Sequence, residues 1–230
     1  MPATLDIPAT ETAIVEMTNA FRAEHKLARV APNPLLAAAA RAYAKVLAAR
    51  NGGLSHTLAG TTPETRVKAA GYAYCQIGEN LAMAYDGRGF SSGGYARLTL
   101  NGWKESPGHR RNLLLPEVTD IGVAIARSGA SDPRYVAVQL FARPRALKYT
   151  FKIANRTTSG VAYTFAGEAR KVLPRQIITH TSCAAGDIAF KLDPRRGGGR
   201  YEARDGQVYT LRPRQGGGVK VEVGGRAASP

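Results

Sequence analysis

Residues 102–114 (GWKESPGHRRNLL) bring an aromatic ring, a carboxylate, a tight turn and an imidazole together within a few positions. An apolar-periodic run ending at Trp103 is typical of the end of a helix. Ser106 can cap the segment that follows, and Pro107 suits a first helical position. We therefore expect His109 on a rigid turn, where an imidazole can bind a metal ion or exchange a proton near neutral pH.

Two upstream segments carry further reactive groups. Residues 77–84 (IGENLAMA) alternate as a strand does and place Glu79 on one face, and residues 54–57 (LSHT) place His56 in a loop. Ser55 and Ser106 are the nearby hydroxyl nucleophiles. Neither lies in a nucleophile-elbow sequence, which disfavours covalent serine catalysis.

Together these motifs resemble the CAP superfamily of cysteine-rich secretory, antigen 5 and pathogenesis-related proteins, in its short bacterial form. The motifs that carry the resemblance are HT at 56–57, GENLA at 78–82, WxxSPGHRxNLL at 103–114 and DIGVA at 120–124. The resemblance covers about residues 11–143. It implies an α-β-α sandwich.

The resemblance also implies a site in which two histidines and two glutamates meet in a cleft on the sheet. His56, Glu79 and His109 match three of these positions. Animal and plant members carry the second glutamate three residues after the tryptophan, where this chain has Ser106. Glu105, one residue earlier, either substitutes for it or points elsewhere.

Three kinds of chemistry fit this set. His56 and His109 could bind a divalent metal, most suitably zinc, with Glu79 and Glu105 orienting the imidazoles. Alternatively, Glu79 and His109 could act as an acid–base pair that activates a water molecule. The third alternative is that these polar groups only tie loops to the sheet.

The activities described for this family diverge, so three functions stay open. The first is a secreted or periplasmic binding protein whose cleft takes an extended envelope ligand, a glycan or a lipid. The second is a cell-envelope hydrolase that cuts glycan or peptide. The third is a structural or interaction protein that acts through its C-terminal region.

Charge points to acidic partners. The chain carries a formal charge of +15, from 32 basic and 17 acidic residues. Such a field favours an anionic cell-envelope polymer or lipid. The basic residues are scattered and lack a nucleic-acid-binding motif, so no nucleic acid partner is expected. No segment reaches the length of a membrane span.

The cellular compartment is inferred from the N-terminus and the cysteines. The first residues show neither the basic nor the apolar region of a signal peptide, which fits a cytoplasmic protein or a mature secreted one. The family resemblance favours the secreted or periplasmic alternative. Cys75 and Cys183 could form one bridge in an oxidising compartment or remain two separate thiols.

The predicted organisation is an N-terminal arm (1–10), a CAP domain (11–145) and a C-terminal β-module (146–230). The fold class is α+β, with a small antiparallel sheet covered by helices. Helices are predicted over residues 11–27, 34–50, 62–70 and 90–103, and strands over 77–84, 119–127 and 135–142. After residue 145, five alternating strands predict a small all-β sandwich or open barrel, at 149–153, 161–165, 188–192, 208–211 and 219–223.

Overall fold

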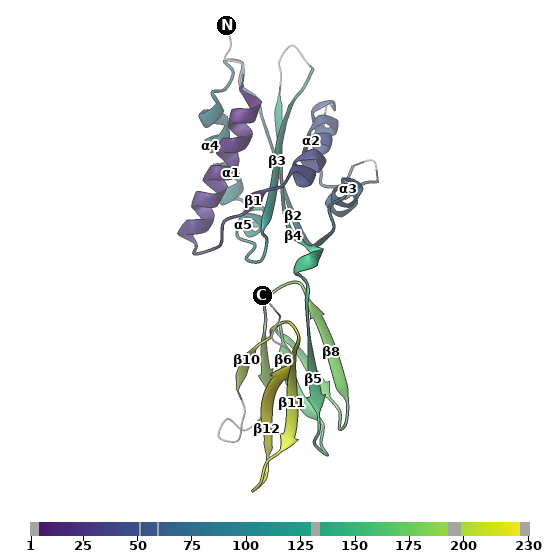
Figure 1. The fold of residues 1–230 in the computed structure, drawn as a ribbon. Helices are drawn as coiled ribbons and strands as arrows, with labels where there is room; N and C mark the ends of the chain where they lie inside the picture. The colour runs from purple at the N-terminus through teal and green to yellow at the C-terminus, as the bar shows by residue number, and fades with distance from the viewer. Residues whose placement is uncertain (1–4, 51, 59, 130–133, 193–198, 226–230) are drawn as a thin grey trace. The chain divides into compact units, whose positions relative to one another are not determined.

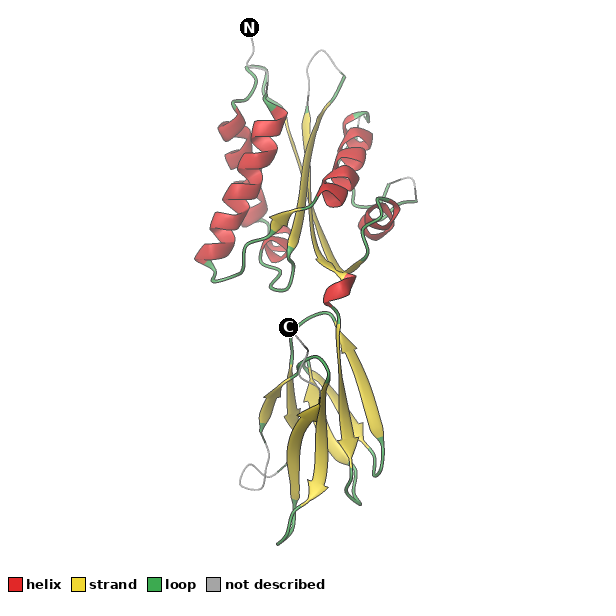
Figure 2. Ribbon diagram, in the orientation of Figure 1, coloured by secondary structure: helices red, strands yellow, loops and turns green. Residues whose placement is uncertain are grey.

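The structure is a computed structural model that describes residues 5–50, 52–58, 60–129, 134–192 and 199–225 (Figure 1). The chain divides into two compact units, Met1–Ala146 and Leu147–Pro230. The first unit holds helices and one sheet, and the second holds strands (Figure 2). The predicted α+β fold with an α-β-α CAP domain and an all-β module is confirmed.

The first unit is an α-β-α sandwich around a four-stranded sheet in the order β1-β3-β4-β2. Helices α1, α4 and α5 cover one face of the sheet, and α2 and α3 cover the other (Figure 1). Its elements are α1 (Ile7–Glu24), β1 (Ala31–Pro32), α2 (Pro34–Ala48), α3 (Pro63–Ala69), β2 (Tyr74–Ala84), α4 (Ser92–Glu105), α5 (Pro107–Leu113), β3 (Asp120–Arg127) and β4 (Tyr135–Pro144).

Strand alternation divides this unit into two cores. Ile121, Val123 and Ile125 of β3 pack with α1 and α4. Ala124 and Ala126, from the same strand, pack with α2. Because successive side chains of a strand point to opposite faces, one strand supplies both cores.

Two glycines and one cap fix how helices approach this sheet. A Cβ on Gly122 of β3 would overlap with the backbone of Leu36 in α2, so a glycine is required for this close contact. Asn33 caps α2 through its side-chain oxygen. At Gly78 in β2, a Cβ would collide with the side chains of Leu115 and Asn112.

The first helix begins several residues earlier than predicted. Helix α1 begins at Ile7, because Asp6 accepts a hydrogen bond from Ala9 N and a proline occupies the first turn. Leu5 is buried in the core beneath α1. Residues 5–10 are therefore part of the first unit, and the described chain has no free arm before residue 11.

The second unit is a β-sandwich. Its sheets have the orders β10-β9-β6-β7 and β12-β11-β5-β8, and side chains of both sheets form one aromatic-rich core. Its strands are β5 (Tyr149–Asn155), β6 (Val161–Phe165), β7 (Glu168–Val172), β8 (Ile177–Ser182), β9 (Asp187–Phe190), β10 (Arg200–Glu202), β11 (Gln207–Pro213) and β12 (Val219–Gly225), after a short 3-10 turn, η1 (Arg145–Leu147). The sequence analysis missed β7, β8 and β10.

Both cysteines lie in described segments, and neither is a free thiol. This finding is against the alternative of two separate thiols. In the parts of the chain that the structure describes, no helix is long and apolar enough to cross a membrane.

Candidate functional site

Strand β2 carries the central residues of the site, and it lies at an edge of the sheet. Glu79 and Asn80 are adjacent on this strand, so their side chains point to opposite faces. Glu79 faces the side covered by α2 and α3, and Asn80 faces the side of α5. The GEN motif therefore connects two layers of the sandwich.

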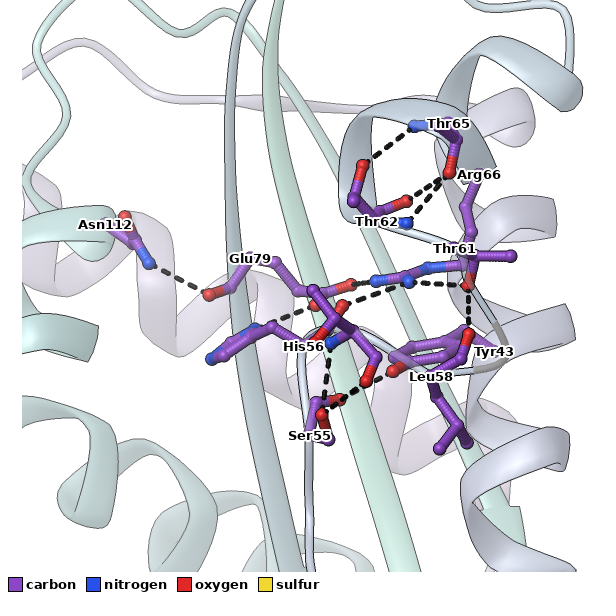
Figure 3. A network of polar contacts seen from close by, with 11 residues as sticks. Tyr43, Ser55, His56, Leu58, Thr61, Thr62, Thr65, Arg66, Glu79 and Asn112 are labelled. Atoms are coloured by element: carbon purple, nitrogen blue, oxygen red, sulfur yellow. Dashed lines mark hydrogen bonds and ion pairs between the residues drawn. The ribbon is translucent and has the colours of Figure 1, made fainter.

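The Glu79 carboxylate is buried between two partners (Figure 3). Its Oε1 lies 2.8 Å from His56 Nδ1, and its Oε2 lies 2.6 Å from a terminal nitrogen of Arg66. The Glu79 side chain is 1% exposed, whereas the His56 side chain is 50% exposed. Both oxygens of the carboxylate accept hydrogen bonds, and the imidazole faces solvent with its other edge.

Arg66 is a site residue that the sequence analysis did not single out. It lies on α3, which Thr62 caps in a reciprocal capping box with Thr65. The guanidinium lies flat over the Tyr43 ring, 3.4 Å from its centroid, and donates to His56 O at 3.2 Å. Tyr43 in turn donates to Ser55 O, so α2 and α3 together hold the loop that carries His56.

The other side of β2 holds His109 in place through its backbone. Asn80 Nδ2 donates to His109 O at 3.2 Å. Asn112, on the same helix as His109, donates to Glu79 O and to Asn80 Oδ1, both at 2.9 Å. A second carbonyl on this edge of β2, Leu81 O, accepts from Trp103 Nε1. The WxxSPGHRxN motif is thus bonded directly to the GEN motif.

These contacts explain why an edge strand is stable there. Glu79 O and Leu81 O would otherwise be carbonyls without a strand neighbour, and buried carbonyls need a donor. Trp103 is 1% exposed and fills the core while it donates. Its role in the structure is therefore packing and capping, as its periodicity predicts.

His109 itself is half-buried on α5, and its pKa is lowered. Burial is the larger cause, and the charge of His56 is the second. The two imidazoles therefore lie close enough to interact electrostatically. A lowered pKa keeps the His109 imidazole neutral near pH 7, the form that can bind a metal ion or accept a proton.

Glu105 lies apart from this group. It is the last residue of α4 and is exposed. Within the described segments its side chain forms neither a hydrogen bond nor an ion pair with His56, Glu79 or His109. Of the four predicted residues, His56 and Glu79 are thus hydrogen-bonded, and His109 lies near enough for the charge of His56 to lower its pKa. Arg66 is the second partner of the Glu79 carboxylate.

The contacts of the three residues define what the site can do. A carboxylate can only accept from an imidazole unless it is protonated, so the bond to Glu79 places the proton of neutral His56 on Nδ1 and leaves Nε2 as a lone-pair donor. Arg66 and His56 each donate to one Glu79 oxygen, so Glu79 orients the His56 imidazole. No group of three or more His, Cys, Asp or Glu side chains in the described residues is arranged to hold a metal.

A metal at this site would therefore have the two imidazoles as its protein ligands. The chemistry of these donors fits zinc better than calcium or magnesium, which prefer oxygen. Glu79 would be the outer partner that orients one ligand. We name this group, His56, Glu79 and His109, the His–Glu site.

The α-β-α sandwich, with Glu79 on the GEN strand and His109 in the SPGH turn, has the architecture that the sequence motifs predict. The family model for the cysteine-rich secretory protein family, CAP, matches residues 15–141 of this chain. The chain therefore belongs to the CAP family.

One bacterial relative matches part of this chain at moderate identity. The chain is 30% identical to YkwD of Bacillus subtilis, an uncharacterised protein, over 124 residues that make up 54% of this chain and 45% of that protein. The chain thus spans less than half the length of this relative.

Among solved structures, the fold is similar to that of an outer surface protein of Borrelia burgdorferi. The TM-score is 0.52 with 22% identity, and the match covers 63% of this chain and all of that one. An extracellular SCP-domain protein of Bacillus anthracis is 28% identical with a TM-score of 0.47, over 60% of this chain and 41% of that protein.

Proposed function

We propose that this protein is an extracytoplasmic binding protein whose His–Glu site takes part of an extended cell-envelope ligand with the help of a bound divalent metal, zinc. One observation carries the proposal: a buried carboxylate fixes His56 with Nε2 free, close to an imidazole whose pKa is lowered. When bound, zinc would supply a Lewis-acid centre that attracts an oxygen of the ligand.

Three features support binding over hydrolysis. Glu79 is held by Arg66 and His56, so it is poorly placed to act as the predicted acid or base. Two protein ligands make a weak, exchangeable metal site, which suits reversible binding. The chain also carries a large positive charge, which favours an anionic envelope polymer or lipid as partner.

The location outside the cytoplasm is part of the same proposal. Neither cysteine is a free thiol, and oxidised cysteines persist in oxidising compartments. The periplasm and the exterior of the cell both satisfy this condition.

The test measures zinc and envelope binding in one set of variants. Calorimetry should show zinc binding to the wild-type protein and no binding to the His56→Ala/His109→Ala double variant. Because imidazoles bind metal in the neutral form, zinc affinity should fall as the pH drops through the lowered pKa of His109. Glu105→Gln is the matched control and should bind zinc like the wild type.

The same proteins are then mixed with purified cell wall, and both pelleted protein and soluble fragments are measured. Pelleting is measured with and without zinc, so that charge-driven pelleting, which does not depend on the metal, is subtracted. Loss of zinc-dependent pelleting in this variant supports the proposal. Soluble fragments that appear with the wild type and vanish with His109→Ala would instead establish hydrolysis. Pelleting that is unchanged in the double variant would place binding elsewhere, as in the third function that the sequence leaves open.

A further inference from the structure

A group of cations gathers around one buried ring on the α1–α4 side of the first unit. Phe21 of α1 is 4% exposed. Lys104 Nζ lies 4.5 Å from the centre of its ring, and the Arg110 guanidinium lies 5.1 Å from it. Both cations are therefore within about 10 Å of each other, roughly one Debye length at ordinary ionic strength.

His25 fixes one of these cations. Its ring packs on Phe21 with centroids 4.4 Å apart, and its Nδ1 lies 2.9 Å from Phe21 O. A guanidinium N–H can only donate, so His25 Nε2 accepts from Arg110 at 3.1 Å and Nδ1 donates to the carbonyl. This bond uses one of the five N–H donors of Arg110 and leaves the others available.

These charges have no acidic partner among the described residues. Neither Lys104 nor Arg110 forms an ion pair there, and the acidic residues next to the group in sequence, Glu24 and Glu105, are exposed and unbonded. Arg22, next to Phe21 in sequence, is buried, and its guanidinium is bonded to the carbonyls of Ala28, Leu113 and Leu115 and to no carboxylate. Lys104 and Arg110 thus repel each other without a bonded counter-charge.

The face of the ring and the end of a helix compensate part of this repulsion. An aromatic face attracts a cation, and Lys104 also lies in the last turn of α4, where the helix dipole favours a positive charge. Neither effect requires two cations over one ring. An anion bound between them would relieve the repulsion and accept hydrogen bonds from both.

We propose that Lys104 and Arg110, supported by His25 on Phe21, form a binding site for a phosphate group. The oxygens of a tetrahedral phosphate can accept hydrogen bonds from the Arg110 guanidinium and from the Lys104 ammonium at once. This site uses other side chains than the His–Glu site and does not require a metal. It goes beyond the proposed function, because it names a second contact and the chemical group that this contact recognises.

Two sources of phosphate are compared with one pair of variants. Inorganic polyphosphate is the soluble probe, followed by calorimetry at low ionic strength. Vesicles of phosphatidylglycerol in phosphatidylcholine are the lipid probe, followed by sedimentation. Lys104→Gln/Arg110→Gln removes two charges from the site, and Lys45→Gln/Arg97→Gln removes two exposed charges elsewhere, with Lys45 in the last turn of α2 as Lys104 is in that of α4.

The site variant should lose about tenfold in affinity for at least one of the two probes. The control should change by less than twofold, and both variants should melt like the wild type and still bind zinc. A loss with polyphosphate supports recognition of a soluble phosphate polymer, and a loss with vesicles alone supports recognition of a lipid headgroup. Equal losses in both variants, or no binding of either probe by the wild type, would overturn the proposal while leaving the zinc result unaffected.

Discussion

The two compact units of this protein use charged groups in opposite ways. The first unit buries several charged and amide side chains, with Glu79, Asn80, Gln139 and Arg22 all nearly inaccessible. In the described part of the second unit, ion pairs such as Arg212–Glu222 and Arg204–Glu202 lie at the surface. The core of that unit is aromatic and aliphatic, with few buried polar groups.

The difference indicates different tasks for the two interiors. A buried ion pair is an inefficient way to stabilise a fold, because desolvation offsets most of the attraction. It does fix side chains in place, as Arg66 and Glu79 fix His56. The first unit therefore contains a buried ion pair that adds little net stability but holds the His56 side chain in place. The second unit is stabilised mainly by apolar burial.

Glu79→Gln tests this difference between the two units with the largest expected effect. It leaves the buried Arg66 without its counter-charge, and we expect the free energy of unfolding of the first unit to fall by about 3–5 kcal/mol. Trp103 is the sole tryptophan and is buried in this unit, so urea unfolding followed by its fluorescence reports this unit alone.

Glu222→Gln is the matched variant in the second unit. Its carboxylate is exposed and bonded to Arg212 and Lys220, and exposed pairs contribute little. We expect no measurable change in stability. A Glu79→Gln variant as stable as the wild type would show that the Arg66–Glu79 pair does not contribute to the stability of the first unit.

Packing between α2 and β3 offers the second test. Gly122→Ala places a methyl group against the backbone of Leu36 and should cost about 1–3 kcal/mol or more through overpacking. Gly102→Ala, on the exposed surface of α4 with no atom near the added methyl, should instead gain up to about 1 kcal/mol. Both are measured by the same Trp103 unfolding curve, and equal effects would contradict the close contact.

The smallest effect is expected from the one histidine buried in the second unit. His180 stacks on Phe151 and its Nε2 lies 2.8 Å from the Tyr163 hydroxyl. Burial, and secondarily the charge of Arg170, lower the pKa of His180 from 6.5. Its neutral form thus stabilises the fold above pH 6.5, and this stability is lost as the pH falls through the lowered pKa.

The loss should stay below about 1.4 kcal/mol per pH unit, the limit for one proton. His180→Phe keeps the stacking and removes the titration, so the slope of stability against pH should vanish in the second unit. The methyl signals of Ile153 and Ile188 in the core of that unit can follow unfolding by NMR between pH 5 and 8. An unchanged slope would mean that other groups carry the pH dependence.

Local sequence alone determined much of the first unit. Asn33 and Thr62 cap α2 and α3, because capping depends on a side chain and the backbone two or three residues away. Ser106, the predicted cap of the next helix, stands at the start of α5 but its side chain makes no capping hydrogen bond. His56, Glu79 and His109 were identified from short motifs whose residues lie next to one another in sequence. Alternation likewise predicted β3, β4 and the buried strands of the sandwich.

Strands with weak local signals were missed. In β7, Glu168 through Lys171 are exposed and Val172 alone is buried, so no alternation marks it as a strand. Its partner β6 and the common core supply the stabilisation that its own sequence does not show. Strand formation depends on such tertiary contacts more than on intrinsic preference.

Only the tertiary structure decided which groups complete the site. Arg66 lies on a surface-type helix where nothing in the neighbouring sequence marks it, and it reaches Glu79 because α3 packs beside β2. Glu105 lies within the motif itself, yet it ends α4 on the exposed side, since its direction is set by the helix phase that buries Trp103. The motifs indicated His56, Glu79 and His109, but contacts between distant segments determined which charge faces Glu79, because the burial and pairing of a charge depend on the whole fold.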